Sequence, residues 1–233
     1  MNLTFKKGIR DGIPIALGYL SVSFAFGLQA VSLGLNVLQA WLISALNLTS
    51  AGQVAGIGLM AAGAPLVEMA LTQLTINLRY ALMSLSLGQK LDASMTTPHR
   101  MAFAFANTDE IFAVASSQEG EVNRRYLYGL MCTPWIGWTL GTLLGAAAGS
   151  ILPEFVRTCL GIAIYGMFVA IVLPPAREKK PVRVVVLLAA AISIAVHYLP
   201  VLKNIPSGYA IILCAVAASA VGAILFPVKE DGQ

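Results

Sequence analysis

Eight long apolar stretches constrain this chain more than any other feature. They cover about residues 13–34, 38–62, 65–88, 100–117, 126–149, 157–173, 182–200 and 206–227. A helix needs roughly 20 apolar residues to cross a bilayer core of about 30 Å. The stretches leave no room for a second, soluble domain, so we expect a single membrane domain over residues 1–233. The predicted fold class is all-α, a polytopic membrane helix bundle with about eight transmembrane spans.

The balance of charged and apolar residues supports this class. Charged residues make up 11% of the chain and apolar residues 58%, whereas ordinary soluble domains have about a quarter and about half. This argues for the lipid bilayer as surroundings and against soluble, disordered and nucleic-acid-binding proteins. The three cysteines and two histidines are widely separated, so we expect no metal site, disulfide framework or cofactor.

The basic residues predict an orientation, because Lys and Arg accumulate in cytoplasmic loops. With eight crossings and the N-terminus inside, ten basic residues fall in cytoplasmic segments and four in external ones. The ten are Lys6, Lys7, Arg10, Arg124, Arg125, Arg177, Lys179, Lys180, Arg183 and Lys229, and the four are Lys90, Arg100, Arg157 and Lys203. We therefore expect both termini to be cytoplasmic in a multi-pass inner-membrane protein. A seven-span alternative, with the second or fourth stretch re-entrant, moves the basic cluster at 177–183 outside and is disfavoured.

Polar residues inside the third stretch lie along one helical face. Glu68, Thr72, Thr75 and Arg79 have the spacing i, i+4, i+7 and i+11, and Asn77 lies on an adjoining stripe. A charge at mid-bilayer costs at least about 2.5–3.5 kcal/mol, so this face must meet protein or a water-filled cavity. It belongs either to an ion pair that fixes helix packing or, as we favour, to a substrate or ion pathway.

The fourth stretch carries Asn107-Thr108-Asp109-Glu110 near its middle. At 1.5 Å per residue, their depth agrees with that of Arg79 within about 5 Å. Asp109 or Glu110 is thus the natural partner of Arg79. The other carboxylate would be left to carry a proton, and Glu68 is a third candidate for proton coupling.

The second stretch is predicted to be an interrupted helix, because a polar segment at 47–53 divides it. Ser50 and Gln53 fit the S-x-x-Q capping box that marks a helix start. A helix start at mid-membrane presents free N–H groups, which discontinuous transporter helices use to hold a substrate carboxylate. The alternative is an ordinary helix contact through small polar residues.

The fifth stretch combines a glycine stripe with two tryptophans. The four glycines Gly137, Gly141, Gly145 and Gly149 predict close helix packing, within the chain or with a partner. Trp135 and Trp138 lie too deep for an interfacial belt, so they either line an apolar pocket or pack in the core.

Several of these segments together resemble the AzlC family of branched-chain amino-acid permeases, the larger subunit of a two-component exporter. The resemblance covers about residues 8–175. It rests on the segment Pro14–Tyr19, the patch Ser50–Gln53, the segment Asn77–Tyr80, the segment Thr108–Glu110 and the glycine stripe. It implies export of leucine, isoleucine and valine, with methionine as a further candidate, and a small AzlD-type membrane subunit as partner. The chain departs from the family pattern at two places that bear on side-chain selectivity. The patch before Gln53 lacks the aromatic residue that many relatives have, and Tyr80 stands where many relatives have His.

The residues independently support a site for a zwitterionic amino acid. Arg79, with N–H groups near Ser50–Gln53, would take the carboxylate, Asp109 or Glu110 the ammonium, and Trp135 or Trp138 the side chain, with Asn77 and Thr108 beside them. No ATP-binding loop is present, so we expect secondary transport rather than enzymatic activity. The alternatives are a non-transporting subunit that stabilises a partner, a channel and, least favoured, a membrane-embedded enzyme.

Overall fold

The computed structural model describes residues 3–149, 151–199, 202 and 204–227. Over these residues ten helices follow one another without a strand: α1 (Phe5–Ser32), α2 (Val37–Leu46), α3 (Ala51–Ala61), α4 (Leu66–Gly88), α5 (Thr97–Ala104), α6 (Asp109–Ser116), α7 (Arg124–Ala148), α8 (Glu154–Glu178), α9 (Lys180–Tyr198) and α10 (Ser207–Leu225). Among the basic residues counted for orientation, Lys203 and Lys229 lie outside the described residues.

The all-α class predicted for a membrane protein is confirmed. In the described part of the chain, α1, α9 and α10 are long and apolar enough to cross a membrane by length and composition. The first helix begins at Phe5, well before residue 13, because Thr4 caps it by accepting a hydrogen bond from the Lys7 N–H at 3.2 Å. The basic residues at 6, 7 and 10 therefore lie within α1 rather than ahead of it.

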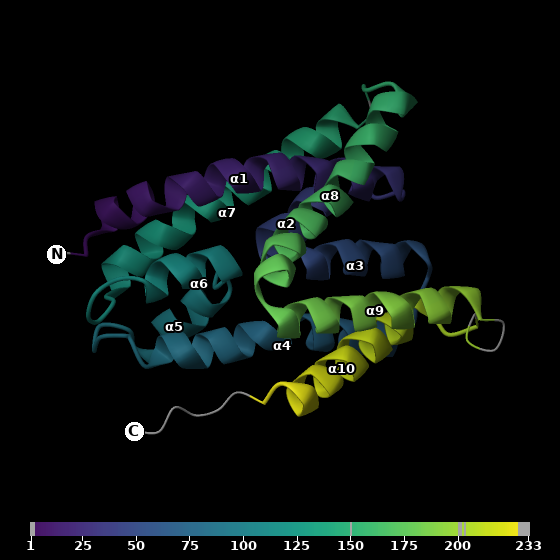
Figure 1. Ribbon diagram of the computed structural model, residues 1–233. Helices are drawn as coiled ribbons and strands as arrows, with labels where there is room; N and C mark the ends of the chain where they lie inside the picture. The colour runs from purple at the N-terminus through teal and green to yellow at the C-terminus, as the bar shows by residue number, and fades with distance from the viewer. Residues whose placement is uncertain (1–2, 150, 200–201, 203, 228–233) are drawn as a thin grey trace. The chain divides into compact units, whose positions relative to one another are not determined.

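The chain divides into two compact units, residues 1–57 with 77–164 and residues 58–76 with 165–233. In the first unit, α7 runs alongside α1 in the same direction, as Figure 1 shows. Gly8 lies against the backbone of Leu130 near the start of both helices, and Gly145 lies against Phe24 nearer their ends. A Cβ atom built on Gly145 would be 2.0 Å from the Phe24 carbonyl oxygen. The two backbones are in contact because glycine leaves that space open.

The glycine stripe of α7 lies in this contact. Gly137 faces Ala16 and Gly141 faces Leu20, as Gly145 faces Phe24, while a Cβ atom built on Gly149 would be 3.4 Å or more from its nearest neighbours. Of the two alternatives for the stripe, packing within the chain is therefore the one found for its first three glycines.

The fourth apolar stretch turns back on itself rather than crossing the unit. The Lys90 ammonium, just after α4, donates to the Ser116 carbonyl at the end of α6 at 2.5 Å. Leu91 and Val122 form an isolated bridge, and Arg124 lies 2.7 Å from His99 at the start of α5. Both ends of the stretch are thus at the same end of the unit. In place of one continuous helix, the break at 105–108 leaves two eight-residue helices, each only about 12 Å long.

The predicted interruption of the second stretch is present between α2 and α3. Gln53, in the first turn of α3, donates from Nε2 to the Ser44 Oγ near the end of α2 at 3.1 Å. This contact folds the start of α3 back toward the end of α2. Figure 1 shows the same reversal in the ribbon. We refer to residues 47–50 as the first tip and residues 105–108 as the second tip.

Candidate functional site

The two tips meet at consecutive residues of α4. Arg79 Nη1 lies 2.5 Å from Asp109 Oδ2, directly after the second tip. The Tyr80 hydroxyl lies 3.4 Å from the Thr49 carbonyl oxygen in the first tip and accepts from Arg79 Nη2 at 3.2 Å. Nearly half of each charged side chain, 47% for Arg79 and 46% for Asp109, remains accessible. The predicted partnership of Arg79 with one of the two acids is present, and the acid is Asp109.

The second acid has a partner on another helix. The Tyr19 hydroxyl of α1 donates to Glu110 and lies 2.7 Å from Thr108 Oγ1. Asp109 and Glu110 occupy the first turn of α6, where the N–H groups at a helix start favour negative charge. Thr108 is the N-cap residue, yet its side chain makes no cap hydrogen bond. The start of α6 therefore places two carboxylates and uncapped backbone donors at one point.

Each tip also contains a buried oxygen without a hydrogen-bond partner in the described chain. These oxygens are Thr49 Oγ1 and Asn107 Oδ1. Asn107 uses its Nδ2 to donate to Ser84 Oγ at 3.0 Å, which ties the second tip to α4. A buried polar atom left without a partner is costly, and such atoms mark sites where a ligand or water completes the bonding. Polar substrate groups would find acceptors at both tips.

The patch Ser50–Gln53, predicted to bind a carboxylate, includes a residue with a structural role, Gln53. Gln53 is buried, and its Oε1 accepts from the Ser50 N–H at 3.3 Å while its Nε2 bonds Ser44. Ser44 Oγ in turn lies 2.7 Å from Thr142 Oγ1 of α7. Gln53 is therefore engaged in holding the tip against α7. Ser50 has φ +46°, in the left-handed region that non-glycine residues rarely adopt, so the tip holds a strained backbone.

The two tryptophans occupy different environments. Trp138 is buried and packs its ring edge-on to Tyr19, with ring centroids 5.2 Å apart. Trp135 is 37% exposed, and its Nε1 donates to the Ala45 carbonyl at 3.0 Å, just before the first tip. Asn77 is half-buried on α4, two residues before Arg79. Only Trp135 therefore presents a substantial surface to a ligand.

Glu68 lies in the other unit and has a separate partner. It is 3% exposed, and its Oε1 accepts a hydrogen bond from the Gly208 N–H, at the start of α10, at 2.8 Å. A Cβ atom on Gly208 would come within 2.6 Å of both Glu68 and Thr72. This carboxylate therefore holds α4 against α10, while its predicted part in proton coupling stays a prediction.

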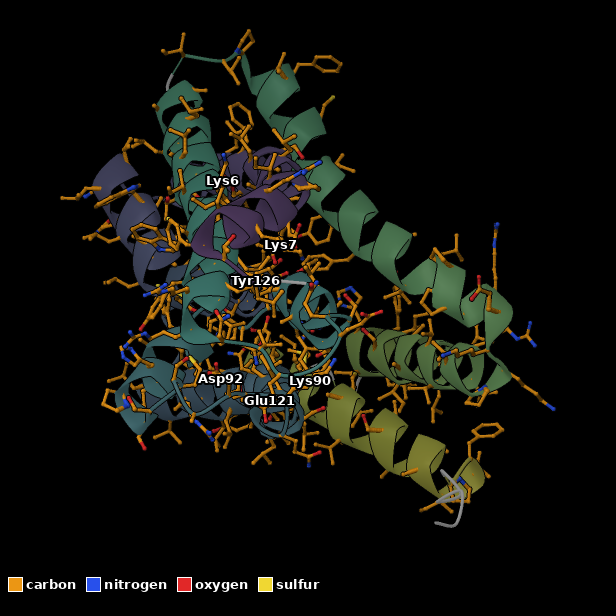
Figure 2. The ribbon with its side chains drawn as sticks, turned by 90° about the vertical axis from the view of Figure 1, so that its left-hand side faces the viewer. Lys6, Lys7, Lys90, Asp92, Glu121 and Tyr126 are labelled. Carbon is orange, nitrogen blue, oxygen red and sulfur yellow. The ribbon has the colours of Figure 1, made fainter. Side chains whose placement is uncertain are left out.

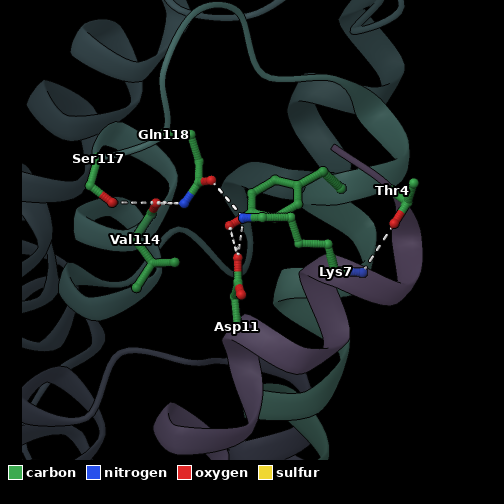
Figure 3. Close-up of polar contacts among 7 residues, drawn as sticks. Thr4, Lys7, Asp11, Val114, Ser117 and Gln118 are labelled. Carbon is green, nitrogen blue, oxygen red and sulfur yellow. Dashed lines mark hydrogen bonds and ion pairs between the residues drawn. The ribbon is translucent and has the colours of Figure 1, made fainter. Parts of the chain in front are cut away.

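A charged network that the sequence reasoning missed holds the far end of α6. Lys7 Nζ donates to Asp11 Oδ2 and to Gln118 Oε1, both at 2.7 Å, as Figure 3 shows. Tyr126 donates to the same Asp11 oxygen at 2.8 Å. Lys90 donates to the carbonyl oxygens of Ser116 and Gln118. Figure 2 shows Lys7, Lys90 and Tyr126 at one end of the unit. The spacing of Lys7 and Asp11, i and i+4, was the available signal.

A family model described as "AzlC protein" matches residues 14–152. The chain belongs to the AzlC family. That match spans both tips, Arg79 and the first three contact glycines of α7.

Individual AzlC relatives extend this likeness over most of the chain. An Escherichia coli K12 protein named "Inner membrane protein YgaZ" is 31% identical over 199 residues, covering 82% of this chain and 81% of its own length. An "Uncharacterized membrane protein" of Archaeoglobus fulgidus is 35% identical over 197 residues, covering 84% and 85%. A Helicobacter pylori 26695 protein of the same name is 29% identical over 175 residues, covering 69% and 75%. No solved structure matches the chain. The chain is thus an AzlC-family membrane protein.

Proposed function

We propose that this protein is a secondary transporter that exports branched-chain amino acids across the inner membrane. The candidate substrates are leucine, isoleucine and valine, and methionine extends the set. The observation that carries the proposal is the pairing of Arg79 with Asp109 between two helix tips, beside a second acid held by Tyr19. Broken helices around charged residues are typical of transporter sites, where the chain ends supply hydrogen-bonding groups.

A zwitterion can exchange with this ion pair without leaving a charge uncompensated. Its carboxylate would bind Arg79, and its ammonium would bind Asp109, so one ion pair is replaced by two. Glu110, which stays bonded to Tyr19 in the meantime, is available to take up or release a proton as the site changes its opening. Coupling to a proton is the finer part of the proposal, with Asp109 and Glu110 as the candidate groups.

The topology that we propose has six crossings rather than eight. With α2–α3 and α5–α6 as hairpins, the ten helices leave α1, α4, α7, α8, α9 and α10 to cross. Both termini are again cytoplasmic. Lys90 and Arg100 join the cytoplasmic side, so the ten against four of the sequence count becomes twelve against two. The stronger excess of basic residues on one side favours the six-crossing arrangement. The inner membrane as location is supported by the printed name of the Escherichia coli relative.

A small AzlD-type membrane subunit is proposed as the partner, as in the two-component arrangement that the family resemblance implies. A rival interpretation is a subunit that stabilises a partner without transporting anything itself. In that case the α1–α7 contact would matter and the Arg79–Asp109 pair would not. A channel differs from the transporter because it gives no counterflow, and from the non-transporting subunit because it still passes a flux, which does not saturate.

The decisive experiment is counterflow of labelled valine in proteoliposomes that contain the full chain, with and without the small subunit. We expect saturable accumulation of label that unlabelled leucine abolishes. The matched variants are Arg79→Met, which removes the cation, and Leu78→Met, which makes a similar change at the adjacent exposed position. Counterflow by Arg79→Met at the wild-type level would refute the binding role. If the wild-type chain shows no counterflow in any preparation, including those with the small subunit, the result would favour the non-transporting subunit.

A further inference from the structure

An apolar groove follows one face of α7 and ends beside the two tips. Its volume is about 540 Å³, within the range of about 300–1,000 Å³ typical of small-molecule sites. Tyr128, Met131, Cys132 and Trp135 line it at helical spacings of three and four, so they share one face of α7. No residue of its lining is charged.

The rest of the groove lining comes from Phe5 at the start of α1 and from one residue at or just before the start of each tip. Ala45 is the second-last residue of α2, and Phe105 is the first residue of the second tip. The polar groups described above belong to the tips themselves or follow them, namely Thr49, Thr108 and Asp109. Each break in a helix thus separates an apolar side, which borders the groove, from a charged side, which borders Arg79.

We infer that this groove binds the aliphatic side chain of the amino acid whose charged ends lie at Arg79 and Asp109. The inference rests on the proposed function and deepens it, because it names the residues that select among substrates. Phe105, Met131, Cys132 and Trp135 are the selecting residues. The occupant is a branched or unbranched aliphatic side chain, because the hydroxyl and N–H groups of the lining side chains are already engaged. The Tyr128 hydroxyl lies 2.9 Å from His99 Nδ1, and Trp135 Nε1 donates to the Ala45 carbonyl at 3.0 Å.

The adjoining charges favour an amino acid over a lipid chain as occupant. A lipid acyl chain would fill the groove without using Arg79, Asp109 or the unpartnered oxygens of the two tips. An aliphatic amino acid uses both halves of the site at once. Each methylene withdrawn from water favours binding about fourfold, so the three carbons by which leucine exceeds alanine favour it by about sixty-fold when the groove encloses them.

The single groove cysteine makes the inference testable by protection. Cys159 and Cys214 are the other cysteines of the chain, and their replacement by alanine leaves Cys132 as the sole thiol. We would measure the alkylation rate of Cys132 by N-ethylmaleimide in proteoliposomes, with leucine, alanine or no amino acid added. At leucine about ten times its half-saturating concentration, mass action leaves about a tenth of the sites free, so alkylation slows about tenfold. Alanine, at ten times its own half-saturating concentration, should leave the Cys132 thiol more accessible to N-ethylmaleimide than leucine does.

A second measurement tests selectivity without relying on the thiol. Cys132→Trp fills the groove, and we expect it to lower leucine counterflow relative to alanine counterflow about tenfold or more. Ile136→Trp is the matched control, since that side chain is 48% exposed and lies outside the groove. Counterflow that depends on Arg79, with no protection of Cys132 and no change of preference in Cys132→Trp, would overturn the groove and leave the proposed function standing. Loss of all counterflow in the wild-type chain would overturn the proposed function itself.

Discussion

Replacing the Arg79–Asp109 pair by apolar side chains separates a binding role from a packing role. Exchanging a paired ion pair for apolar residues of similar volume is often neutral or stabilising by about 1–4 kcal/mol. Because the two side chains are 47% and 46% exposed, we expect the lower end of that range for the double variant Arg79→Met with Asp109→Leu. The single variant Arg79→Met, in contrast, leaves the Asp109 carboxylate unpaired. The double variant should therefore be produced at the wild-type level and unfold at an equal or higher temperature.

The same double variant should lose transport. A hydrogen bond to a charged group contributes about 1.5–3 kcal/mol, and the zwitterion loses two such bonds, so binding weakens at least about a hundredfold. Counterflow of labelled leucine, at protein amounts matched between preparations, measures this loss, and thermal unfolding in detergent measures stability. Counterflow that stays within about tenfold of the wild type, which corresponds to 1.4 kcal/mol, would refute the binding role.

Three further perturbations test other parts of the structure. Gly145→Ala should lower the unfolding temperature, because the added Cβ would lie 2.0 Å from the Phe24 oxygen. Its control is Gly18→Ala, which has open space around it and should stabilise α1 by up to about 1 kcal/mol. The same change of unfolding temperature in both variants would contradict the α1–α7 contact. Tyr19→Phe removes the hydroxyl that is bonded to Glu110. It should slow counterflow about tenfold without changing the unfolding temperature. An unchanged counterflow rate would show that this hydrogen bond is dispensable for transport. Lys90→Met leaves the carbonyl groups at the end of α6 without their cation. Amide hydrogen exchange over residues 109–116 should therefore accelerate, while exchange in α9 is unaffected. Unchanged exchange over residues 109–116 would mean that contacts other than those of Lys90 hold α6 in place.

The apolar stretches were sufficient to predict most helix limits. The predicted ranges 65–88, 126–149 and 206–227 correspond to α4, α7 and α10 within two residues at each end. The physical reason is that a bilayer requires a continuous apolar segment of fixed length, and polar residues mark where it ends. The largest displacement, at the start of α1, arose because Thr4 begins the helix on basic residues that were taken as a preceding segment.

Hydropathy alone could not distinguish a crossing from a hairpin. A helix of about 20 residues and two half-helices joined by a short polar tip have the same length and mean hydropathy. The first tip was predicted because Ser50 and Gln53 match a capping pattern. The second was missed because Asp109 and Glu110 were placed near the middle of a continuous helix. The available signal was Thr108 followed directly by two acids, the composition of a helix start.

The parallel direction of α1 and α7 constrains any membrane topology of this chain. Two parallel spanning helices require an odd number of crossings between them, and α4 supplies one, so the two interrupted stretches either both cross or both return. The contacts of Lys90 and Arg124 place both ends of α5–α6 together, which supports the proposed hairpin for that stretch and, by parity, for α2–α3. A single re-entrant stretch, the seven-span alternative, is therefore inconsistent with the α1–α7 contact.

Two hairpins whose tips meet also provide the two electrostatic environments that a zwitterion needs. Each tip joins the C-terminal end of one helix, rich in carbonyl groups, to the N-terminal end of the next, rich in N–H groups. A crossing helix has neither at its middle, because all its backbone groups are paired internally. The strained Ser50 and the unpartnered oxygens of Thr49 and Asn107 are costs of breaking the helices. Such costs persist where the broken backbone serves a ligand, so the tips, as well as the charges, support the substrate site that we propose.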